Sequence, residues 1–600
     1  MTISAGGNEV RADSDQGTSE PTVKPADQSG ARIRTAAVMS PRQQWQYWVI
    51  VLLWAFVNGQ FWAWWLGGNH VGNPILFFLA SIAQFYAFTV LASMYLFYVG
   101  HMRKPVPVTV QQARDAGALG RVATISLTVP SSESLEFVRR QLVAMSQISQ
   151  PHDSWILVDK VHSPEIAELA ESLGVKYFCR HDETRWGKEK VAAWSEPATK
   201  AGNVNCWLSA HGDEYTHFTQ FDIDHYASPD YLDKVLGYFI DPTVKWVQAP
   251  SIYGNLDNWI ARGSAEQELG LQGPLQMGYF GFSQTPFIIG SHCTYETAAI
   301  KSIGGFQITR AEDHLDTVAL AAVGYEGVFV PEVIAVGEGP ERFDTYLAQQ
   351  FAWSFSMFEV LFFHMLWLLP RYNRRQAMQF LFAETWYGCY SLSMLAMFLL
   401  PLVSLSFNTP LSHVGYFGYL SHSLPVVGMG TVIWLWCRDW TFPAGLRLSW
   451  RGVVLHVARW VFVVDAFAQV VMRAKKDYMI TKKGVDKDQS SATPMRLLAP
   501  YAILTLLPMA ACWRFTTVYR DGPCQGYLFL ALQGSLVFWL LLLTVTIQEL
   551  RADRRHGWSF PQRLRLYSSP VLLVSVLGVL LLATSIQSAE PTFEAIMSRF

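Results

Sequence analysis

Charged residues are scarce in this sequence. Only 16% of its 600 residues are Asp, Glu, Lys or Arg, whereas soluble proteins average about 25%. This shortage argues against a disordered chain and against an ordinary soluble enzyme along the full length. The net charge is −2, so no basic excess points to nucleic acid, and we expect no nucleic-acid partner.

Paired cysteine motifs are also missing. The seven cysteines form no Cys-x-x-Cys pair, and we therefore expect neither a structural zinc site nor a disulfide framework. In place of charge the chain has 51% hydrophobic and 14% aromatic residues, including 23 Trp. A mixture of membrane spans and a sizeable water-soluble domain would account for this composition.

The N-terminal hundred residues divide into a polar tail and two apolar runs. Residues 1–42 are rich in Gly, Ser, Asp, Glu, Pro and Thr, and we predict a disordered cytoplasmic tail there. Residues 43–102 hold two runs without Asp, Glu, Lys or Arg, each long enough to cross about 30 Å of hydrocarbon as a helix. Basic residues flank both outer ends, which places the tail and the following domain in the cytoplasm.

Charge returns over residues 103–342, where short β-like runs alternate with helical stretches such as 135–147 and 229–240. The predicted strands are 121–130, 154–159, 175–180, 217–224 and 244–250. This alternation predicts a mostly parallel α/β sheet. Ligands bind such sheets beyond the carboxyl ends of the strands, so the chemistry-bearing residues should follow strands directly.

The remaining chain is apolar and aromatic again. We predict amphipathic interface helices over 343–375, two transmembrane helices over 376–437, an interface helix and a loop over 449–490, and C-terminal transmembrane helices over 497–600. The predicted spans are 376–407, 412–437, 497–513, 524–548 and 568–588, which makes about seven in the whole chain.

Three charged residues bear on that division. Arg459 and Asp465 lie inside the apolar stretch 452–472, and charges at a bilayer centre are costly, so we expect this helix to lie at the interface. Glu384 stands alone in its predicted span and is a functional candidate by default, unless the span begins after it.

Asp222 and Asp224 follow a predicted strand with one residue between them. Two carboxylates at this spacing suit a hard divalent cation, Mg²⁺ or Mn²⁺, which would bridge them to a diphosphate. In isolation, such a pair is more often a solvated acidic turn.

The order of the surrounding motifs carries more weight. "VPSSES" follows the first predicted strand and Asp159 ends the next, and then come "KAGNVN" from Lys200, the Asp-x-Asp pair, Glu312-Asp313 and Gln349-x-x-x-Trp353. In this order the chain resembles the family 2 glycosyltransferases, specifically the processive, membrane-embedded branch that is cellulose-synthase-like or curdlan (β-glucan) synthase-like and related to hyaluronan synthases. The resemblance covers roughly residues 45–590.

The resemblance implies a glycosyltransferase-A-type (Rossmann-like) α/β cytosolic domain inserted in an α-helical transmembrane bundle. It implies an inverting hexosyltransferase of the plasma (cell inner) membrane that extends a β-glucan from a nucleotide sugar. The polymer would pass through the enzyme's own transmembrane channel. UDP-glucose is the favoured donor, the growing polysaccharide and the lipid bilayer are expected partners, and an accessory secretion protein is a further candidate partner.

The resemblance also assigns roles to particular residues. Inverting transfer needs a base for the proton of the acceptor hydroxyl, and Asp313 with Glu312 beside it fits that role. Its alternative reading is a carboxylate that complements a helix N-terminus. Asp224, supported by Asp222, would hold the metal. The donor nucleotide would be contacted by Glu133, Asp159, Lys200, Gly202, Asp222, Thr481 and Lys483, and the acceptor by Trp353 and Gln349.

Thr481 and Lys483 belong to "YMITKK", residues 478–483. This segment resembles the Phe-x-Val-Thr-x-Lys gating loop of cellulose synthases and likewise follows a predicted interface helix. Because hyaluronan synthases lack that form of the loop, the match leans to the glucan branch.

One position departs from the family pattern. The family has Gln-x-x-Arg-Trp, whereas Ala352 stands here at the arginine position. In the family this arginine helps to hold the donor's diphosphate, and losing a charge-assisted contact should weaken donor binding by a few kcal/mol at most. Lys483 is the natural replacement, with Arg310 as a second candidate.

Three alternatives remain open at this stage. One is a hyaluronan- or chitin-type synthase that uses UDP-GlcNAc, and another is a non-processive glycosyltransferase that acts on a lipid. A third, from a different class, is a transporter or channel with an inert transferase-like domain. The retained carboxylates Asp159, Asp222, Asp224 and Asp313 count against the third.

Overall fold

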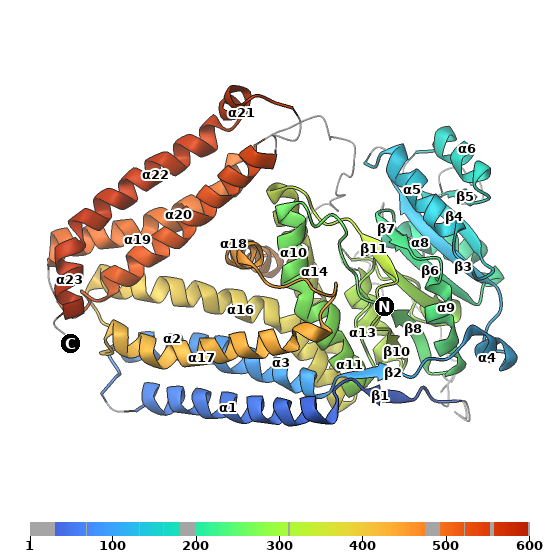
Figure 1. The fold of residues 1–600 in the computed structure, drawn as a ribbon, viewed down its shortest axis with the longest axis horizontal. Helices are drawn as coiled ribbons and strands as arrows, with labels where there is room; N and C mark the ends of the chain where they lie inside the picture. Colours follow the sequence, from blue (N-terminus) through green and yellow to red (C-terminus); the bar gives the residue numbers. More distant parts are fainter. Residues whose placement is uncertain are drawn as a thin grey trace, which may run out of the picture.

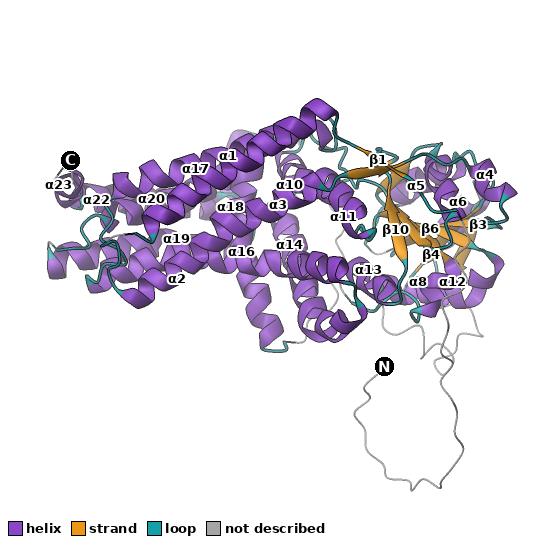
Figure 2. Ribbon diagram, turned by 90° about the horizontal axis from the view of Figure 1, so that it is seen from below, coloured by secondary structure: helices purple, strands orange, loops and turns teal. Residues whose placement is uncertain are grey.

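The computed structural model of the chain describes residues 31–67, 69–130, 132–159, 161–180, 199–309, 312–474, 492–520, 522–552 and 557–597. An α/β domain lies at one end of a bundle of long helices (Figure 1). Seen from below, in Figure 2, the strands again gather at that one end and the helices fill the rest of the length.

The α/β domain is built on a seven-stranded sheet of order β10-β8-β9-β6-β3-β4-β5. Its strands are β3 (Val122–Thr128), β4 (Asp153–Val158), β5 (Lys176–Cys179), β6 (His217–Asp222), β8 (Val244–Gln248), β9 (His292–Glu296) and β10 (Glu326–Phe329). Neighbouring strands pair in parallel except at β9, which is antiparallel to both β6 and β8. The five predicted strands are confirmed, and β9 and β10 extend the sheet.

Both faces of the sheet are buried, as expected for parallel strands. In β4, Trp155 and Leu157 join one apolar cluster, while Ile156 and Val158 join another on the opposite face. The first face is covered by α8 (Lys200–His211) and α12 (Thr297–Ser302), and the second by α5 (Leu135–Ser146), α6 (Pro164–Ser172) and α9 (Tyr231–Val235).

The reversed direction of β9 shapes the carboxyl edge of the sheet. Because β9 is antiparallel to its neighbours, it begins at the edge where the parallel strands end. Gly290 and Ser291 directly precede β9, and the backbone N–H of Asp222, at the end of β6, donates to the Ser291 carbonyl at 2.9 Å. The segment before β9 therefore contributes to the edge at which ligands of such sheets bind.

The helical region contains the predicted spans. They appear as α1 (Pro41–Trp65), α2 (Pro74–Gln84) continued by α3 (Leu91–Gly100), α16 (Arg374–Phe407), α17 (Tyr416–Trp436), α19 (Met495–Arg514), α20 (Tyr527–Ala552) and α22 (Ser568–Gln587). Over the described ranges, nine helices are long and apolar enough to cross a membrane, judged by length and composition alone. Seven of them coincide with the predicted spans.

The other two helices that meet this criterion are residues 343–371, which begin with α14 (Phe343–Glu359), and α18 (Trp450–Val471). Both were predicted as interface helices, and that position stays a prediction. In Figure 1, α14 and its neighbour α10 (Trp259–Gly270) run across the direction of the long helices, and α18 is seen nearly end on. Such a crossing orientation favours the interface assignment.

The prediction of a disordered tail up to residue 42 is wrong for its last part. Strand β1 (Thr35–Ala37) pairs antiparallel with β2 (Arg103–Pro105), and the Ile33 backbone N–H donates to Asp241 Oδ2 at 2.8 Å. Ile33 and Met39 are buried in the cluster on one face of the sheet. These two side chains give the segment apolar contacts, although the average composition of the tail is polar. Residues 1–30 lie outside the described residues.

The remaining elements are short. A two-stranded ladder joins β7 (His225–Ala227) to β11 (Ala335–Gly337). The other helices are α4 (Val110–Asp115), α11 (Gln276–Ser283), α13 (Glu312–Ala322), α15 (Leu366–Leu368), α21 (Phe560–Leu566) and α23 (Ala589–Met597).

Candidate active site

Glu133 lies in the loop that follows β3. Its Oε2 accepts hydrogen bonds from the Thr128 hydroxyl at 2.6 Å and from the Val129 backbone N–H at 2.9 Å. The carboxylate therefore ties the loop to the end of its own strand. Its predicted contact with the donor nucleotide stays a prediction.

Asp159 follows β4 and is held by an arginine that the sequence reasoning did not single out. Arg180, directly after β5, donates from Nε to Oδ1 at 2.8 Å and from its terminal nitrogen to Oδ2 at 2.9 Å. Both side chains are only 7% exposed. A bidentate, nearly buried pair of this kind fixes the carboxylate in one orientation.

Lys200 is the centre of an ion-pair network. It is the first residue of α8, whose N-cap Thr199 accepts from the Gly202 backbone N–H at 3.1 Å. The Lys200 Nζ lies 2.8 Å from Asp222 Oδ1, 3.0 Å from Glu312 Oε1 and 2.8 Å from the Gly290 carbonyl oxygen. One ammonium group thus joins two predicted site carboxylates from distant parts of the chain. Gly202 takes part in the cap that positions this lysine.

Glu312 opens α13 and is buried against Lys200. Burial raises its pKa, and the Lys200 cation opposes that rise while the neighbouring Asp313 carboxylate adds to it, so the pKa lies above the ordinary value. Its contacts show that Glu312 holds Lys200 in place, beside the residue predicted as the base.

Asp313 is half-buried next to Gly290, at the carboxyl edge of the sheet. Gly290 has φ +69°, and a Cβ there would lie only 3.0 Å from Asp313 Oδ2. Glycine is needed both for this left-handed backbone and for the close approach. Because the Gly290 carbonyl also accepts from Lys200, the predicted base and the ion-pair network meet at this one residue.

Asp222, Asp224 and His225 offer a cluster of metal-ligand atoms. One ligand atom from each lies within 4.8 Å of the others. Asp224 is 2% exposed, and its Oδ1 lies 3.3 Å from His225 Nδ1, whose other ring nitrogen lies 3.2 Å from the Ser251 hydroxyl. Two carboxylates and an imidazole form a donor set that fits a divalent cation. His225 was not among the predicted ligands, although it directly follows the Asp-x-Asp pair.

The family of this chain can be identified by comparison with known protein families. Residues 217–581, well over half of the chain, match the family described as glycosyl transferase family group 2. The chain belongs to this family. The predicted resemblance to family 2 glycosyltransferases of the cellulose-synthase type is thereby confirmed, as is the fold of a glycosyltransferase-A-type α/β domain attached to a helical membrane region.

The curated relatives of this glycosyltransferase are distant. Cellulose synthase 1 catalytic subunit [UDP-forming] of Komagataeibacter xylinus is 24% identical over 247 residues, which are 40% of this chain and 31% of the relative. Probable glucomannan 4-beta-mannosyltransferase 1 of Arabidopsis thaliana is 22% identical over 305 residues, 47% of this chain and 52% of the relative. The chain therefore spans about half or less of the length of these relatives.

Similar solved structures include a mannosyltransferase, PcManGT from Pyrobaculum calidifontis, in complex with GDP-Man and Mn²⁺. It is 14% identical with a TM-score of 0.41, over 66% of this chain and 100% of that one. Glucosyl-3-phosphoglycerate synthase from Mycobacterium tuberculosis, in complex with Mn²⁺ and UDP, is 10% identical with a TM-score of 0.26, over 39% of this chain and 77% of that one.

Gln349, which was predicted to contact the acceptor, belongs to α14. It lies beside the Tyr253 hydroxyl, whose pKa is raised by burial and by the charges of Glu268 and Asp224. The Gln349 Oε1 is buried and has no hydrogen-bond partner among the described residues. Trp353 and Ala352 lie one turn further along α14 and are partly exposed.

A buried polar path continues from Tyr253 into the helical region. Glu268 Oε1 lies 3.5 Å from the Tyr253 hydroxyl, and burial raises the pKa of Glu268 to about 7. The Arg459 charge acts on Glu268, and the Arg459 guanidinium lies 5.1 Å from the ring centres of both Trp386 and Tyr387. Arg459 was predicted to lie at the interface because of its charge, and the structure gives that charge aromatic partners in α16.

Three further residues were proposed for the donor site from the sequence, one threonine and two cations. Thr481 and Lys483 of the proposed gating loop lie outside the described residues, and so does Arg310. Their contribution to the donor site stays a prediction.

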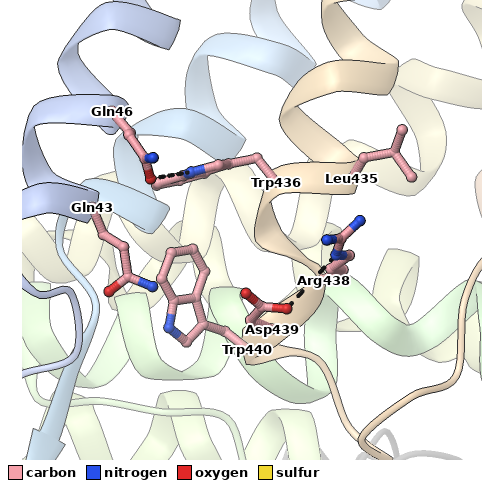
Figure 3. A pocket seen from close by; sticks show the side chains of 7 residues that line it. All are labelled: Gln43, Gln46, Leu435, Trp436, Arg438, Asp439 and Trp440. Carbon is pink, nitrogen blue, oxygen red and sulfur yellow. Dashed lines mark hydrogen bonds and ion pairs between the residues drawn. The ribbon is translucent and has the colours of Figure 1, made fainter.

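A separate pocket of about 240 Å³ lies away from this site, between the start of α1 and the end of α17. Figure 3 shows its lining, in which Gln46 accepts a hydrogen bond from the Trp436 indole at 3.3 Å and Arg438 faces Asp439. None of the predicted site residues lines it. The pocket is therefore distinct from the candidate site.

Proposed function

We propose that this protein is a membrane-embedded, inverting β-glycan synthase that transfers a sugar from a nucleotide sugar to a growing polysaccharide. The observation that carries the proposal is the Lys200 network, because it brings Asp222 and Glu312, and with them the predicted metal ligands and base, to one edge of the sheet. Family membership supports the same reaction class.

In the proposed reaction, the Asp313 carboxylate accepts the proton of the acceptor hydroxyl as the hydroxyl oxygen bonds to the anomeric carbon of the donor sugar. The bond from that carbon to the diphosphate oxygen breaks on the opposite side, so that the nucleoside diphosphate leaves and the configuration inverts. Glu312 and Lys200 keep the base helix and Asp222 together during this step.

The donor set of Asp222, Asp224 and His225 suits Mg²⁺ or Mn²⁺. Lys200 binds one oxygen of Asp222, and the carboxylate has a second oxygen to offer to a cation. A divalent ion bound there would offset the charge that gathers on the departing diphosphate.

The path from Gln349 and Tyr253 through Glu268 to Arg459 supports a route for the product. Its buried polar atoms can bond sugar hydroxyls, and the Trp386 and Tyr387 rings offer flat apolar faces to the C–H surface of a sugar. Trp353 would offer such a face nearer to the acceptor end. We propose that the growing polymer leaves along this path and through the protein's own helices.

UDP-glucose is the proposed donor, since the named cellulose synthase is UDP-forming. The glucomannan mannosyltransferase among the relatives makes a mannosyl donor the leading competitor. We place the α/β domain in the cytoplasm at the plasma membrane because Arg32, Arg34 and Arg42 precede the first span and Arg103 and Lys104 follow the second. An accessory secretion protein remains a prediction from the resemblance.

The test uses the full chain in lipid nanodiscs with UDP-glucose, UDP-GlcNAc or GDP-mannose, supplied separately with Mg²⁺ or Mn²⁺. We expect release of nucleoside diphosphate and a polymer that a linkage-specific β-glycanase degrades. Diphosphate release without polymer would replace synthesis by transfer to a small or lipid acceptor. No release with any donor would contradict the proposal and favour an inert transferase-like domain on a transporter.

A further inference from the structure

Helix α13, which carries the proposed base, docks on the membrane helix α16. Leu315 and Val318 of α13 share an apolar cluster with Phe380 and Ala383 of α16. Just before α16, the Tyr372 hydroxyl donates to the Val318 carbonyl at 2.9 Å. The position of the base is therefore set partly by a helix that belongs to the membrane region.

One ion pair crosses this apolar contact. His314 Nδ1 lies 3.2 Å from Glu384 Oε1, and the Glu384 side chain is 0% exposed while that of His314 is 22% exposed. The second Glu384 oxygen has no hydrogen-bond partner among the described residues. Glu384 was the lone carboxylate of its predicted span. Because an unpaired buried charge is costly, the His314 imidazolium is what makes a carboxylate tolerable at this position.

His314 directly follows Asp313, and its backbone N–H donates to Asp313 Oδ1 at 2.9 Å. Its ring lies 4.7 Å from the ring of Phe287, which is an apolar neighbour. The residue that pairs with Glu384 is therefore the same residue whose backbone N–H bonds the base.

The charge state of the pair follows from the groups that face it. These are Asp313 on α13, Glu384 on α16, Tyr279 on α11 and Tyr372 before α16. Burial acts to lower the pKa of His314, but the Glu384 and Asp313 carboxylates outweigh it, so the pKa lies above its ordinary value. Burial raises the pKa of both tyrosines, which therefore stay neutral where His314 titrates.

We propose that His314 and Glu384 are positioning residues, which form an ion pair across the α13–α16 contact and thereby aim the Asp313 carboxylate at the acceptor hydroxyl. Apolar packing alone would hold the two helices together, but it would leave rotation and sliding of α13 open, whereas a charge-assisted hydrogen bond is directional. The inference rests on the proposed glycosyl transfer.

The first test is Glu384→Gln, which keeps the size of the side chain and removes its charge. We expect kcat to fall by about tenfold, because small displacements of a catalytic group can cost up to about 10²-fold, while the donor KM stays within about twofold. Amide hydrogen exchange over residues 312–322 should become faster. Thr385→Val is the matched control, since the Thr385 hydroxyl bonds only to the Leu381 and Phe382 carbonyls of its own helix in the described contacts.

The second test is the pH profile of kcat. A pair that needs protonated histidine is intact below the ordinary pKa of histidine and is lost as the pH rises through the raised pKa of His314. We expect an alkaline decline in the wild type that is absent in Glu384→Gln. His314→Lys keeps a cation with a much higher pKa, so it should retain kcat within about threefold and shift the decline upward.

The outcomes separate the pairing from the reaction itself. A wild type that transfers no sugar would overturn the proposed function and the pairing with it. A wild type that transfers sugar, with Glu384→Gln equal to Thr385→Val in kcat and pH profile, would overturn the pairing alone. If Glu384→Gln does not fold, a folded His314→Lys with an unshifted alkaline decline overturns the pairing just as well.

Discussion

Charged side chains have different kinds of neighbours at the sheet edge and along the polar path in the helical region. At the sheet edge, charged side chains pair with side chains of opposite charge. Asp159 is held by Arg180, and Lys200 lies between Asp222 and Glu312. These pairs are close, with oxygen–nitrogen distances from 2.8 to 3.0 Å.

Along the polar path in the helical region, by contrast, Arg459 and Glu268 lie beside rings and neutral polar groups. Arg459 lies over Trp386 and Tyr387, and Glu268 lies beside Tyr253 and Gln272. Under the proposed function, this difference follows the substrate. The donor carries a charged diphosphate that needs fixed charges, whereas the polymer is neutral and needs aromatic faces and hydrogen bonds. Substitutions in the two regions should therefore differ in size and in kind.

The largest effect is expected at Asp313. Asp313→Asn keeps the shape of the side chain and removes its basicity, so polymer formation should fall by about 10²- to 10⁴-fold, as for a lost general base. Binding of the donor, measured by isothermal titration of the nucleoside diphosphate, should change by less than about twofold. An Asn variant with substantial turnover would show that another group takes the proton.

Lys200→Met should damage both stability and activity. It leaves Glu312 buried beside Asp313 without its cation, and breaking a buried pair costs about 3–5 kcal/mol, here toward the lower end because Lys200 is partly exposed. Thermal unfolding in nanodiscs measures this loss, and Glu312→Gln in the same chain should recover part of it, as a double-mutant cycle would report.

A matched control for that variant is Lys301→Met, which removes an ion pair to Asp213, whose side chain is 92% exposed. Exposed pairs contribute about 0–1 kcal/mol. Equal losses at Lys200 and Lys301 would remove the contrast between the sheet-edge network and ordinary surface pairs.

Asp224→Asn should have an intermediate effect that added metal reverses. The variant loses one hard anionic ligand, so the Mg²⁺ or Mn²⁺ concentration for half-maximal rate should rise by about tenfold or more. EDTA should abolish wild-type turnover, and excess metal should restore it. Full turnover in EDTA would show that the carboxylates at the end of β6 act without a cation.

Glu268→Gln should have an effect on stability that depends on pH. Because the pKa of Glu268 rises from 4.5 to about 7 on burial, the folded state binds its proton more tightly than the unfolded state does. Glu268 therefore makes stability fall as the pH rises from about 4.5 to about 7, and the loss is complete above that. Glu268→Gln should be near neutral at pH 5 and stabilising at pH 8, as measured by thermal unfolding. The same cost at both pH values would mean that Glu268 is ionised and paired in the folded protein.

Much of the architecture could be predicted from the sequence because it follows from periodicity. The runs around Ile156 and Phe218 alternate between two buried faces of the sheet, and the uncharged runs before and after the α/β domain became the long helices. The tail strand Thr35–Ala37 could not be predicted in this way, since it is fixed by pairing with Arg103–Pro105 rather than by its own pattern.

The site was predictable by residue type and order but not by pairing. Lys200 and Asp222 were expected at the donor and Glu312 beside the base. That the Lys200 ammonium binds both carboxylates could not be predicted, because this contact depends on how α8, β6 and α13 meet. Arg180 could have been found, because it ends a predicted strand at the same edge as Asp159. The His314–Glu384 contact joins residues 70 positions apart, and local sequence carries no signal for it.

The reversed strand β9 has a consequence for how the two regions are joined. Residues 249–291 leave the sheet after β8 and return to it at β9 on the same edge, so this excursion never crosses the sheet. It carries α10, which packs on α18, and it ends at Gly290, whose carbonyl binds Lys200. Insertions or deletions within it would leave every strand in register while changing the reach between catalytic domain and membrane. The segment is a link of adjustable length between the two regions, and its end at Gly290 contacts the candidate site.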